Sequence, residues 1–132
     1  TVKESLRKTY DFYGKRILVV EDEENNMSFL ETVLKKTRAT LIFAHNGEEA
    51  VQQCEKHPDL NLVLMDIKMP VMSGDVATTL IKEKRKDLPV IAQTAYATPT
   101  EVERYKQIGF DDYITKPINR DHLTEVLEKY LR

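Results

Sequence analysis

The chain has 132 residues, the length of one average domain, and 41% of them are hydrophobic while 32% are charged. Its 20 Lys and Arg residues nearly balance its 22 Asp and Glu residues, and this excludes a strongly basic nucleic-acid-binding surface. The longest apolar runs, such as residues 17–20 and 62–65, are far shorter than the roughly 20 residues of a membrane span. The single cysteine, Cys54, cannot form an internal disulfide, so we expect a protein of the reducing cytoplasm. From the charge balance and the short apolar runs we expect no direct contact with nucleic acid or membrane.

No repeat or low-complexity block divides the chain. We therefore predict one domain over residues 15–132, preceded by a linker or leader at residues 1–14. Within this leader, Leu6, Tyr10 and Tyr13 recur at spacings typical of one helical stripe. Because the first residue is Thr1 rather than Met, we expect the sequence to be a piece of a longer chain.

From residue 15 onward, short β-branched runs alternate with stretches of helical period. The predicted strands are residues 16–21, 40–44, 60–65, 90–94 and 111–115. The predicted helices carry apolar faces made, in chain order, by Met27, Leu30, Val33 and Leu34, by Gly47, Ala50, Val51 and Cys54, by Ala77, Leu80 and Ile81, and by Leu123, Val126, Leu127, Tyr130 and Leu131. A further helix is predicted between the last two of these sets. It begins after the capping residue Thr98, with Pro99 in its first turn, and ends at Gly109. Asn46 is likewise the predicted capping residue of the helix that carries Ala50 and Cys54.

Single helices between apolar strands predict an α/β fold with a five-stranded parallel sheet and helices on both faces. Ligands of such sheets bind beyond the carboxyl ends of the strands. At those ends the sequence places Glu21 and Asp22, then Asp66, Thr94 and Lys116. Three carboxylates, one hydroxyl and one ammonium group are therefore expected to converge at one edge of the sheet.

This group of charges predicts a metal and a phosphoryl group. Two carboxylates about 4 Å apart repel by around 4 kcal/mol at an effective dielectric constant near 20, so three of them need a compensating cation. Mg²⁺ suits them, because it binds carboxylates and waters and shares its coordination sphere with phosphate. Asp66 is the predicted nucleophile, since an aspartate can form an acyl phosphate, and Glu21 and Asp22 are predicted to hold the metal.

Four motifs carry a resemblance to a known family. They are residues 17–22 (ILVVED), residues 64–70 (LMDIKMP) with 72–74 (MSG), residues 93–95 (QTA) and residues 112–117 (DYITKP). In this order and at these separations they resemble the receiver domains of two-component response regulators, over residues 15–132. The resemblance implies the flavodoxin-like receiver fold, with strand order 2-1-3-4-5.

The resemblance also implies the chemistry of the site. Asp66 would accept phosphate from a phosphohistidine. Asp22, Asp66 and the backbone carbonyl of Lys68 would ligate Mg²⁺ or Mn²⁺, and Glu21 would act largely through water. The phosphate would be bound by Thr94, by Lys116 and by the backbone N–H groups of Lys68 and Ala95.

A conformational switch is implied as well. Thr94 would move toward the phosphate, and Tyr113 would turn inward as it does so. The Lys116–Pro117 peptide bond would be cis, which is affordable at an X-Pro bond. We also hypothesise that Lys68 and Tyr96 flank the path of the attacking water and influence how long the acyl phosphate survives.

The implied phosphodonor is a histidine kinase or a histidine phosphotransfer domain. The output and homodimer face would be formed by the helix after Thr98, the strand 111–115 and the last helix, including Glu101, Arg104, Tyr105 and Lys106. The missing initial Met, the leader and the C-terminus directly after the last helix favour the C-terminal receiver of a hybrid sensor histidine kinase, cytoplasmic and attached to a membrane-anchored sensor. A stand-alone single-domain regulator is the alternative. The domain would catalyse only its own phosphorylation and dephosphorylation, whereas the parent chain would be a kinase.

Two other classes compete with this interpretation. An Mg²⁺-dependent phosphatase with an aspartyl nucleophile is expected to have a second aspartate two residues after the first, where this chain has Lys68. A flavodoxin-like cofactor-binding protein needs a phosphate-cradling loop after the first strand, where residues 21–24 are all acidic.

Each residue also has a structural alternative. Asp22 could cap a helix, Glu21 could be a surface charge, Thr94 an ordinary strand residue and Tyr113 a core aromatic. We expect Cys54 to be a small core residue. The three histidines are expected to be surface residues, and they are His45, His57 and His122.

Overall fold

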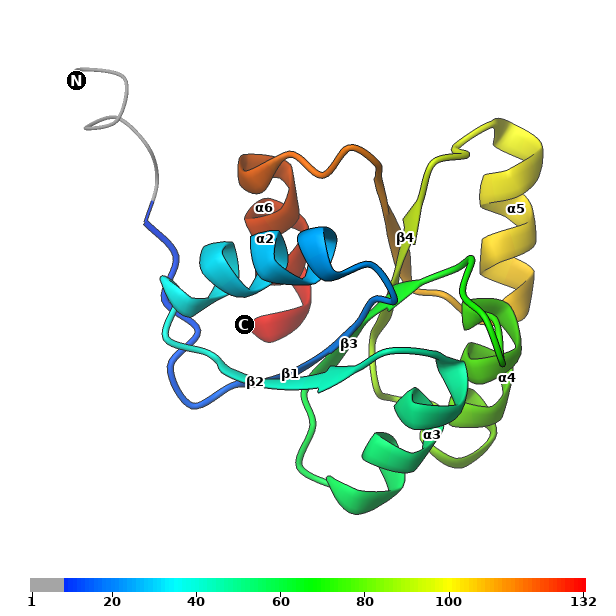
Figure 1. Cartoon of the computed structure of the whole chain (residues 1–132), viewed down its shortest axis with the longest axis horizontal. Helices are drawn as coiled ribbons and strands as arrows, with labels where there is room; N and C mark the ends of the chain where they lie inside the picture. Colours follow the sequence, from blue (N-terminus) through cyan, green and yellow to red (C-terminus); the bar gives the residue numbers. More distant parts are fainter. Residues whose placement is uncertain (1–8) are drawn as a thin grey trace.

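Five parallel strands form one sheet in the computed structural model, which describes residues 9–132 (Figure 1). The strands are β1 (Arg16–Val20), β2 (Thr40–Ala44), β3 (Leu62–Asp66), β4 (Val90–Thr94) and β5 (Asp112–Thr115). The helices are α2 (Glu24–Lys35), α3 (Gly47–Lys56), α4 (Gly74–Lys84), α5 (Pro99–Ile108) and α6 (Arg120–Leu131). The strand order is β2-β1-β3-β4-β5, which confirms the predicted fold class and topology.

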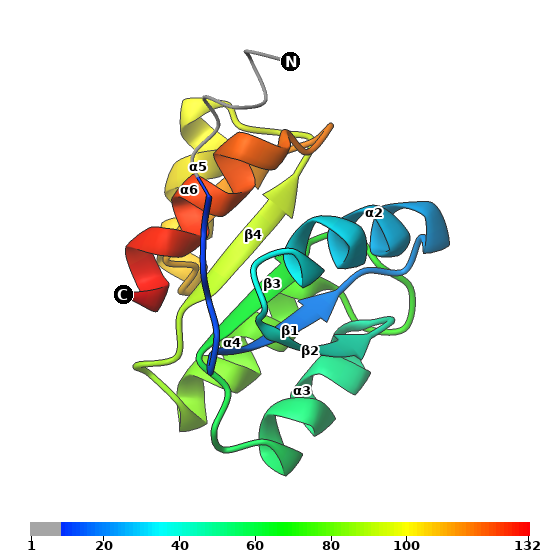
Figure 2. The ribbon, with the colours of Figure 1, turned by 90° about the vertical axis from the view of Figure 1, so that its left-hand side faces the viewer.

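Both faces of the sheet are covered, because side chains alternate along strands that are apolar throughout. Leu18, Val20, Val63 and Met65 belong to the core under α3, α4 and α5. The alternate residues, Ile17, Val19, Leu62 and Leu64, belong to the core under α2 and α6. Figure 2 shows α2 and α6 on the opposite side of the sheet from α3 and α4. No helix within residues 9–132 is long and apolar enough to cross a membrane.

The register brings the carboxyl ends of the strands to one edge. Val20 is paired with Met65, Asp66 with Gln93, and Thr94 with Thr115. The chain therefore leaves β1, β3, β4 and β5 at nearly the same level. This alignment places the residues that follow these strands beside one another.

Helix ends follow the predicted capping residues. The side chain of Asn46 accepts a hydrogen bond from the Glu49 N–H at 2.9 Å, and that of Thr98 accepts one from the Glu101 N–H at 3.3 Å. Gly109 ends α5 with a φ of 123°, a backbone conformation that favours glycine.

Four details differ from the sequence-based expectations, and the smallest is that β5 begins at Asp112, one residue after the predicted start. The strand β3 covers residues 62–66 instead of 60–65, because Leu60 is buried in the preceding turn while Asp66 still pairs with Gln93. The strand β1 ends at Val20, one residue before the predicted end. Leu80 was expected on the apolar face of α4 but is 36% exposed, because Gly74, Ala77, Thr78 and Ile81 form the inward stripe.

The described part of the leader, residues 9–14, is not helical. Of the predicted stripe, Leu6 lies outside the described residues, and Tyr10 and Tyr13 lie in irregular chain. Phe12, which sequence reasoning missed, is buried in the core beside α2 and α6, and its N–H donates to the Thr37 carbonyl at 2.7 Å. The boundary between leader and domain stays a prediction.

Candidate functional site

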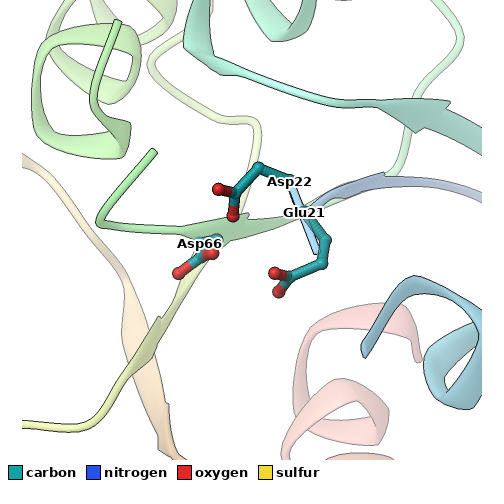
Figure 3. A group of neighbouring side chains, drawn as sticks. All are labelled: Glu21, Asp22 and Asp66. Carbon is teal, nitrogen blue, oxygen red and sulfur yellow. The ribbon is translucent and has the colours of Figure 1, made fainter. Parts of the chain in front are cut away.

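Three carboxylates meet at the carboxyl edge of the sheet. Glu21 and Asp22 directly follow β1, and Asp66 is the last residue of β3. One oxygen from each lies within 4.8 Å of the other two, and Figure 3 shows the three side chains gathered in one place. Glu21 and Asp66 are buried, whereas Asp22 is exposed. The convergence of the three carboxylates that the sequence predicts is therefore present.

Lys116 supplies the positive charge of this site. Its Nζ donates to Asp66 Oδ1 at 2.9 Å and lies 3.7 Å from Glu21 Oε2. Its backbone N–H donates to the Thr94 carbonyl at 2.8 Å, and its peptide bond to Pro117 is cis. One ammonium group thus contacts two of the three carboxylates.

The negative charge of the site exceeds what Lys116 balances. Burial, reinforced by the Asp66 charge, raises the pKa of Glu21 to about 7. Burial also raises the pKa of Asp66, and the opposing effect of Lys116 is too small to reverse it. For Lys116, burial alone would lower the pKa, but the hydrogen bond and charge of Asp66 and the charge of Glu21 outweigh burial and raise it.

One buried oxygen of Glu21 lacks a hydrogen-bond donor within residues 9–132, and the Lys116 ammonium lies 3.7 Å from it. Glu21 Oε1 accepts the Glu23 N–H at 3.2 Å, while Glu21 Oε2 has no hydrogen-bond partner among the described residues. A buried carboxylate oxygen without a donor is costly. A hard divalent cation, which prefers oxygen ligands, fits this set of donors.

A pocket of about 100 Å³ opens beside Asp66. It is lined by all the residues that the resemblance implies for phosphate binding, namely Lys68, Thr94, Ala95 and Lys116. The Nζ of Lys68 lies 4.4 Å from the centre of the Tyr96 ring, which also lines the pocket. The pocket therefore joins the acidic cluster to β4 and to the loop that follows it.

The loop after β3 packs closely against Asp66. The Gly74 N–H donates to the Ile67 carbonyl at 2.8 Å. A Cβ atom at position 74 would lie 2.1 Å from the backbone oxygen of Asp66, so only glycine fits there. This close approach fixes the backbone that carries the candidate nucleophile.

Sequence reasoning gave Gln93 no role of its own at the site, and it placed Arg104 and Tyr105 only on the output face. Gln93 is buried, and its Nε2 donates to the Val20 carbonyl at 3.3 Å; a lone strand glutamine gives no sequence signal. Arg104 also lines the pocket. Tyr105 was expected on the exposed output face, but it is only 3% exposed, because its ring packs edge-on against Phe110 and its hydroxyl contacts Thr94.

The remaining candidates lie away from this pocket. Tyr113 is half-buried and packs against the core under α3, α4 and α5. Cys54 is buried in the same core, and burial raises its pKa to about 11. The histidines are not among the pocket residues; His45 and His122 are exposed and His57 is half-buried.

Comparisons with known proteins agree with this geometry. The model of the response regulator receiver domain family matches residues 17–128. The chain is 38% identical over 120 residues to the polar-differentiation response regulator DivK of Brucella ovis, covering 89% of this chain and 96% of DivK. It is 34% identical over 128 residues to the sensor histidine kinase GacS of Pseudomonas protegens, covering 93% of this chain but only 14% of GacS.

Solved structures give the same result. The receiver domain of a Pseudomonas aeruginosa sensor histidine kinase, described with a magnesium ion coordinated in its active-site cleft, is 32% identical with a TM-score of 0.82, and 89% of this chain and 98% of that chain are covered. The receiver domain of the yeast response regulator Ssk1, crystallised with the histidine phosphotransfer protein Ypd1, gives 27% identity and a TM-score of 0.83, with 94% and 91% covered. With the family model, the strand order and the acidic edge in agreement, this chain belongs to the response regulator receiver domains of two-component signalling.

Proposed function

We propose that Asp66 is the phosphoacceptor of this receiver domain. The observation that supports it best is the meeting of the Asp66 carboxylate with Lys116 at 2.9 Å and with two further carboxylates within 4.8 Å. An oxygen of Asp66 attacks the phosphorus of a phosphohistidine, the phosphorus–nitrogen bond breaks, and the histidine leaves with the electron pair. The product is an acyl phosphate on Asp66.

The acidic cluster is proposed to hold Mg²⁺, or Mn²⁺ in its place. Glu21, Asp22, Asp66 and the backbone carbonyl of Lys68 are the proposed ligands, with Glu21 acting largely through water. The buried Glu21 Oε2, which has no hydrogen-bond donor in the described part of the chain, and the raised pKa of Glu21 support this assignment. When bound, the cation would neutralise charge at the reacting centre.

The groups around the pocket are proposed to hold the phosphoryl oxygens. Lys116 is held at the site by Asp66, and the backbone N–H groups of Lys68 and Ala95 belong to residues that line the pocket. Thr94 would donate its hydroxyl proton to a phosphoryl oxygen. Phosphoryl transfer depends mainly on such positioning and charge neutralisation.

Phosphorylation is proposed to alter the surface formed by α5, β5 and α6. Thr94 and Tyr113 would move together, and the altered surface would contact an output partner or a second copy of the chain. Tyr113, on β5, is half-buried and packs against the core under α3, α4 and α5, so a change of its side-chain rotamer would alter this surface.

The phosphodonor is proposed to be a histidine kinase or a histidine phosphotransfer domain, as in the complex of the yeast relative. The similarity to GacS favours a C-terminal receiver of a hybrid sensor histidine kinase, on the cytoplasmic side of a membrane-anchored parent. The similarity to DivK over 96% of its length favours the stand-alone alternative. In either arrangement we propose a receiver over residues 15–132, with residues 1–14 as a linker.

Incubation with acetyl phosphate and Mg²⁺ tests the proposed reaction. A phosphoacceptor gains one phosphoryl group, which is stable to acid and labile to base, and releases phosphate only as that group hydrolyses. The competing class, an Mg²⁺-dependent aspartyl phosphatase, would instead release phosphate through many rapid turnovers from external phosphomonoesters. Rapid, repeated turnover of such substrates would overturn the proposal.

A further inference from the structure

Tyr105 is a buried tyrosine whose hydroxyl lies beside Thr94. It belongs to α5, and its side-chain oxygen is 2.7 Å from Thr94 Oγ1 and 2.8 Å from the Tyr96 carbonyl oxygen. Its ring packs edge-on against Phe110, with the ring centres 5.9 Å apart. Both the ring and the hydroxyl of Tyr105 are therefore held in place.

The hydrogen bonds around Thr94 can be assigned by counting protons. The Tyr96 N–H donates to Thr94 Oγ1 at 2.9 Å, and the Tyr96 carbonyl can only accept. The Tyr105 oxygen lies closer to that carbonyl, at 2.8 Å, than Thr94 Oγ1 does, at 3.1 Å, so Tyr105 donates to the carbonyl. Thr94 then donates its single proton to the Tyr105 oxygen at 2.7 Å.

We propose that Tyr105 is a positioning residue that holds the Thr94 hydroxyl in the unphosphorylated orientation. This inference rests on the proposed function, in which Thr94 gives its proton to a phosphoryl oxygen on Asp66. To do so, Thr94 must exchange its hydrogen bond with Tyr105 for one with the phosphoryl group. The free energy of that lost hydrogen bond opposes phosphorylation.

The same exchange links the phosphorylation site to α5. Tyr105 contacts Thr94 directly, and the preceding residue, Arg104, anchors α5 to α4 through an ion pair with Asp75 at 2.7 Å. Release of the Tyr105 hydroxyl therefore changes the buried side of α5. The exposed side of α5 belongs to the proposed output surface. This route to α5 acts in addition to the Tyr113 switch.

The variant Tyr105→Phe tests the inference, because it removes the hydroxyl and keeps the ring. Beryllofluoride, which mimics a phosphoryl group on aspartate, is titrated into the 132-residue chain at saturating Mg²⁺, and binding is measured by NMR or calorimetry. We expect beryllofluoride to bind the variant about three- to tenfold more tightly than the wild type, since one competing hydrogen bond is gone. The Mg²⁺ affinity of Tyr105→Phe without beryllofluoride should equal that of the wild type, whereas a general disturbance of the structure would change it.

Two further variants complete the test. Tyr130→Phe also removes a tyrosine hydroxyl, one that contacts Asp111 and Asp112 instead of Thr94, and should leave beryllofluoride affinity unchanged. In a Thr94→Ala background, Tyr105→Phe should have no effect. Equal affinities of the wild type and Tyr105→Phe, or the same gain in the Thr94→Ala background, would overturn the inference. If the wild type binds no beryllofluoride at all, the proposed function itself fails.

Discussion

Lys116 and Asp66 are 50 residues apart in the sequence, yet Lys116 Nζ donates to Asp66 Oδ1 at 2.9 Å. The contact follows from the topology, because β3 and β5 lie on either side of β4 and end at the same edge of the sheet. Lys116 balances one carboxylate, while Glu21 and Asp22 add two more within 4.8 Å. The repulsion among the three carboxylates is therefore greatest when no cation is bound.

The first prediction concerns the pH dependence of stability without divalent ions. The pKa of Glu21 is about 7 in the folded chain, above its ordinary value of 4.5. Between these values the folded state holds a proton that the unfolded state releases, so the contribution of Glu21 destabilises the fold as the pH rises from 5 to 8. We expect Glu21→Gln to raise the free energy of unfolding by about 1 to 3 kcal/mol at pH 8, and by much less at pH 5.

Urea unfolding in EDTA at both pH values measures this difference. Glu125→Gln, an exposed change on α6, serves as the control and should leave the pH profile unaltered. If the difference in the free energy of unfolding between Glu21→Gln and the wild type is the same at pH 5 and pH 8, the raised pKa of Glu21 is refuted.

The second prediction concerns the metal. Asp22→Asn removes one exposed carboxylate from the cluster without disturbing buried packing. We expect Mg²⁺ affinity, measured by calorimetry at pH 8, to fall at least about tenfold, since Mg²⁺ depends on carboxylate ligands. The distant exposed acid Asp87 provides a control through Asp87→Asn, which should bind Mg²⁺ like the wild type. Equal affinities of the two variants would place the metal elsewhere.

The sequence predicted the fold well because its evidence was redundant. The alternation of strands and helices, the capping residues Asn46 and Thr98, and the terminating Gly109 all agreed on the same element boundaries. The acidic edge was predictable for the same reason, since parallel topology alone brings Glu21 and Asp66 together. Predictions failed where a single side chain had to be placed. Leu80 faces solvent because the smaller Ala77 and Thr78 lie closer to the sheet.

The role of Tyr105 was beyond the sequence for a different reason. Its hydrogen bond to Thr94 depends on how the loop after β4 turns back toward α5, and no local pattern encodes that turn. Phe12 was missed similarly, because a lone aromatic residue in the leader gives no periodic signal. Local patterns therefore located the elements, whereas contacts between loops and helices needed the structure.

The third prediction concerns the lifetime of the acyl phosphate. Lys68 Nζ lies 4.4 Å from the centre of the Tyr96 ring at the pocket, and we propose that the two side chains together restrict the approach of water. Lys68→Ala and Tyr96→Ala should each speed dephosphorylation by about two- to fivefold, and the double variant should be no faster than the faster single variant. A time course of phosphate loss after removal of the phosphodonor measures this. Unchanged lifetimes in both single variants would remove the idea.

The fourth prediction concerns the backbone around the nucleophile. Gly74→Ala would place a Cβ atom 2.1 Å from the Asp66 backbone oxygen, and neither backbone segment can move without disturbing the site. We expect a loss of stability of about 3 kcal/mol or more, measured by urea unfolding. Val76→Ala, at a half-exposed position of the same helix, should cost much less. Comparable losses for the two variants would show that the close packing at residue 74 is not needed.

The most direct test of the whole account is the intact mass of the chain before and after treatment with acetyl phosphate and Mg²⁺. The wild type should gain the mass of one phosphoryl group, and Asp66→Asn, which keeps the size of the side chain but removes the nucleophilic carboxylate, should gain none. An asparagine variant that is labelled as readily as the wild type would contradict the assignment of Asp66 as the acceptor.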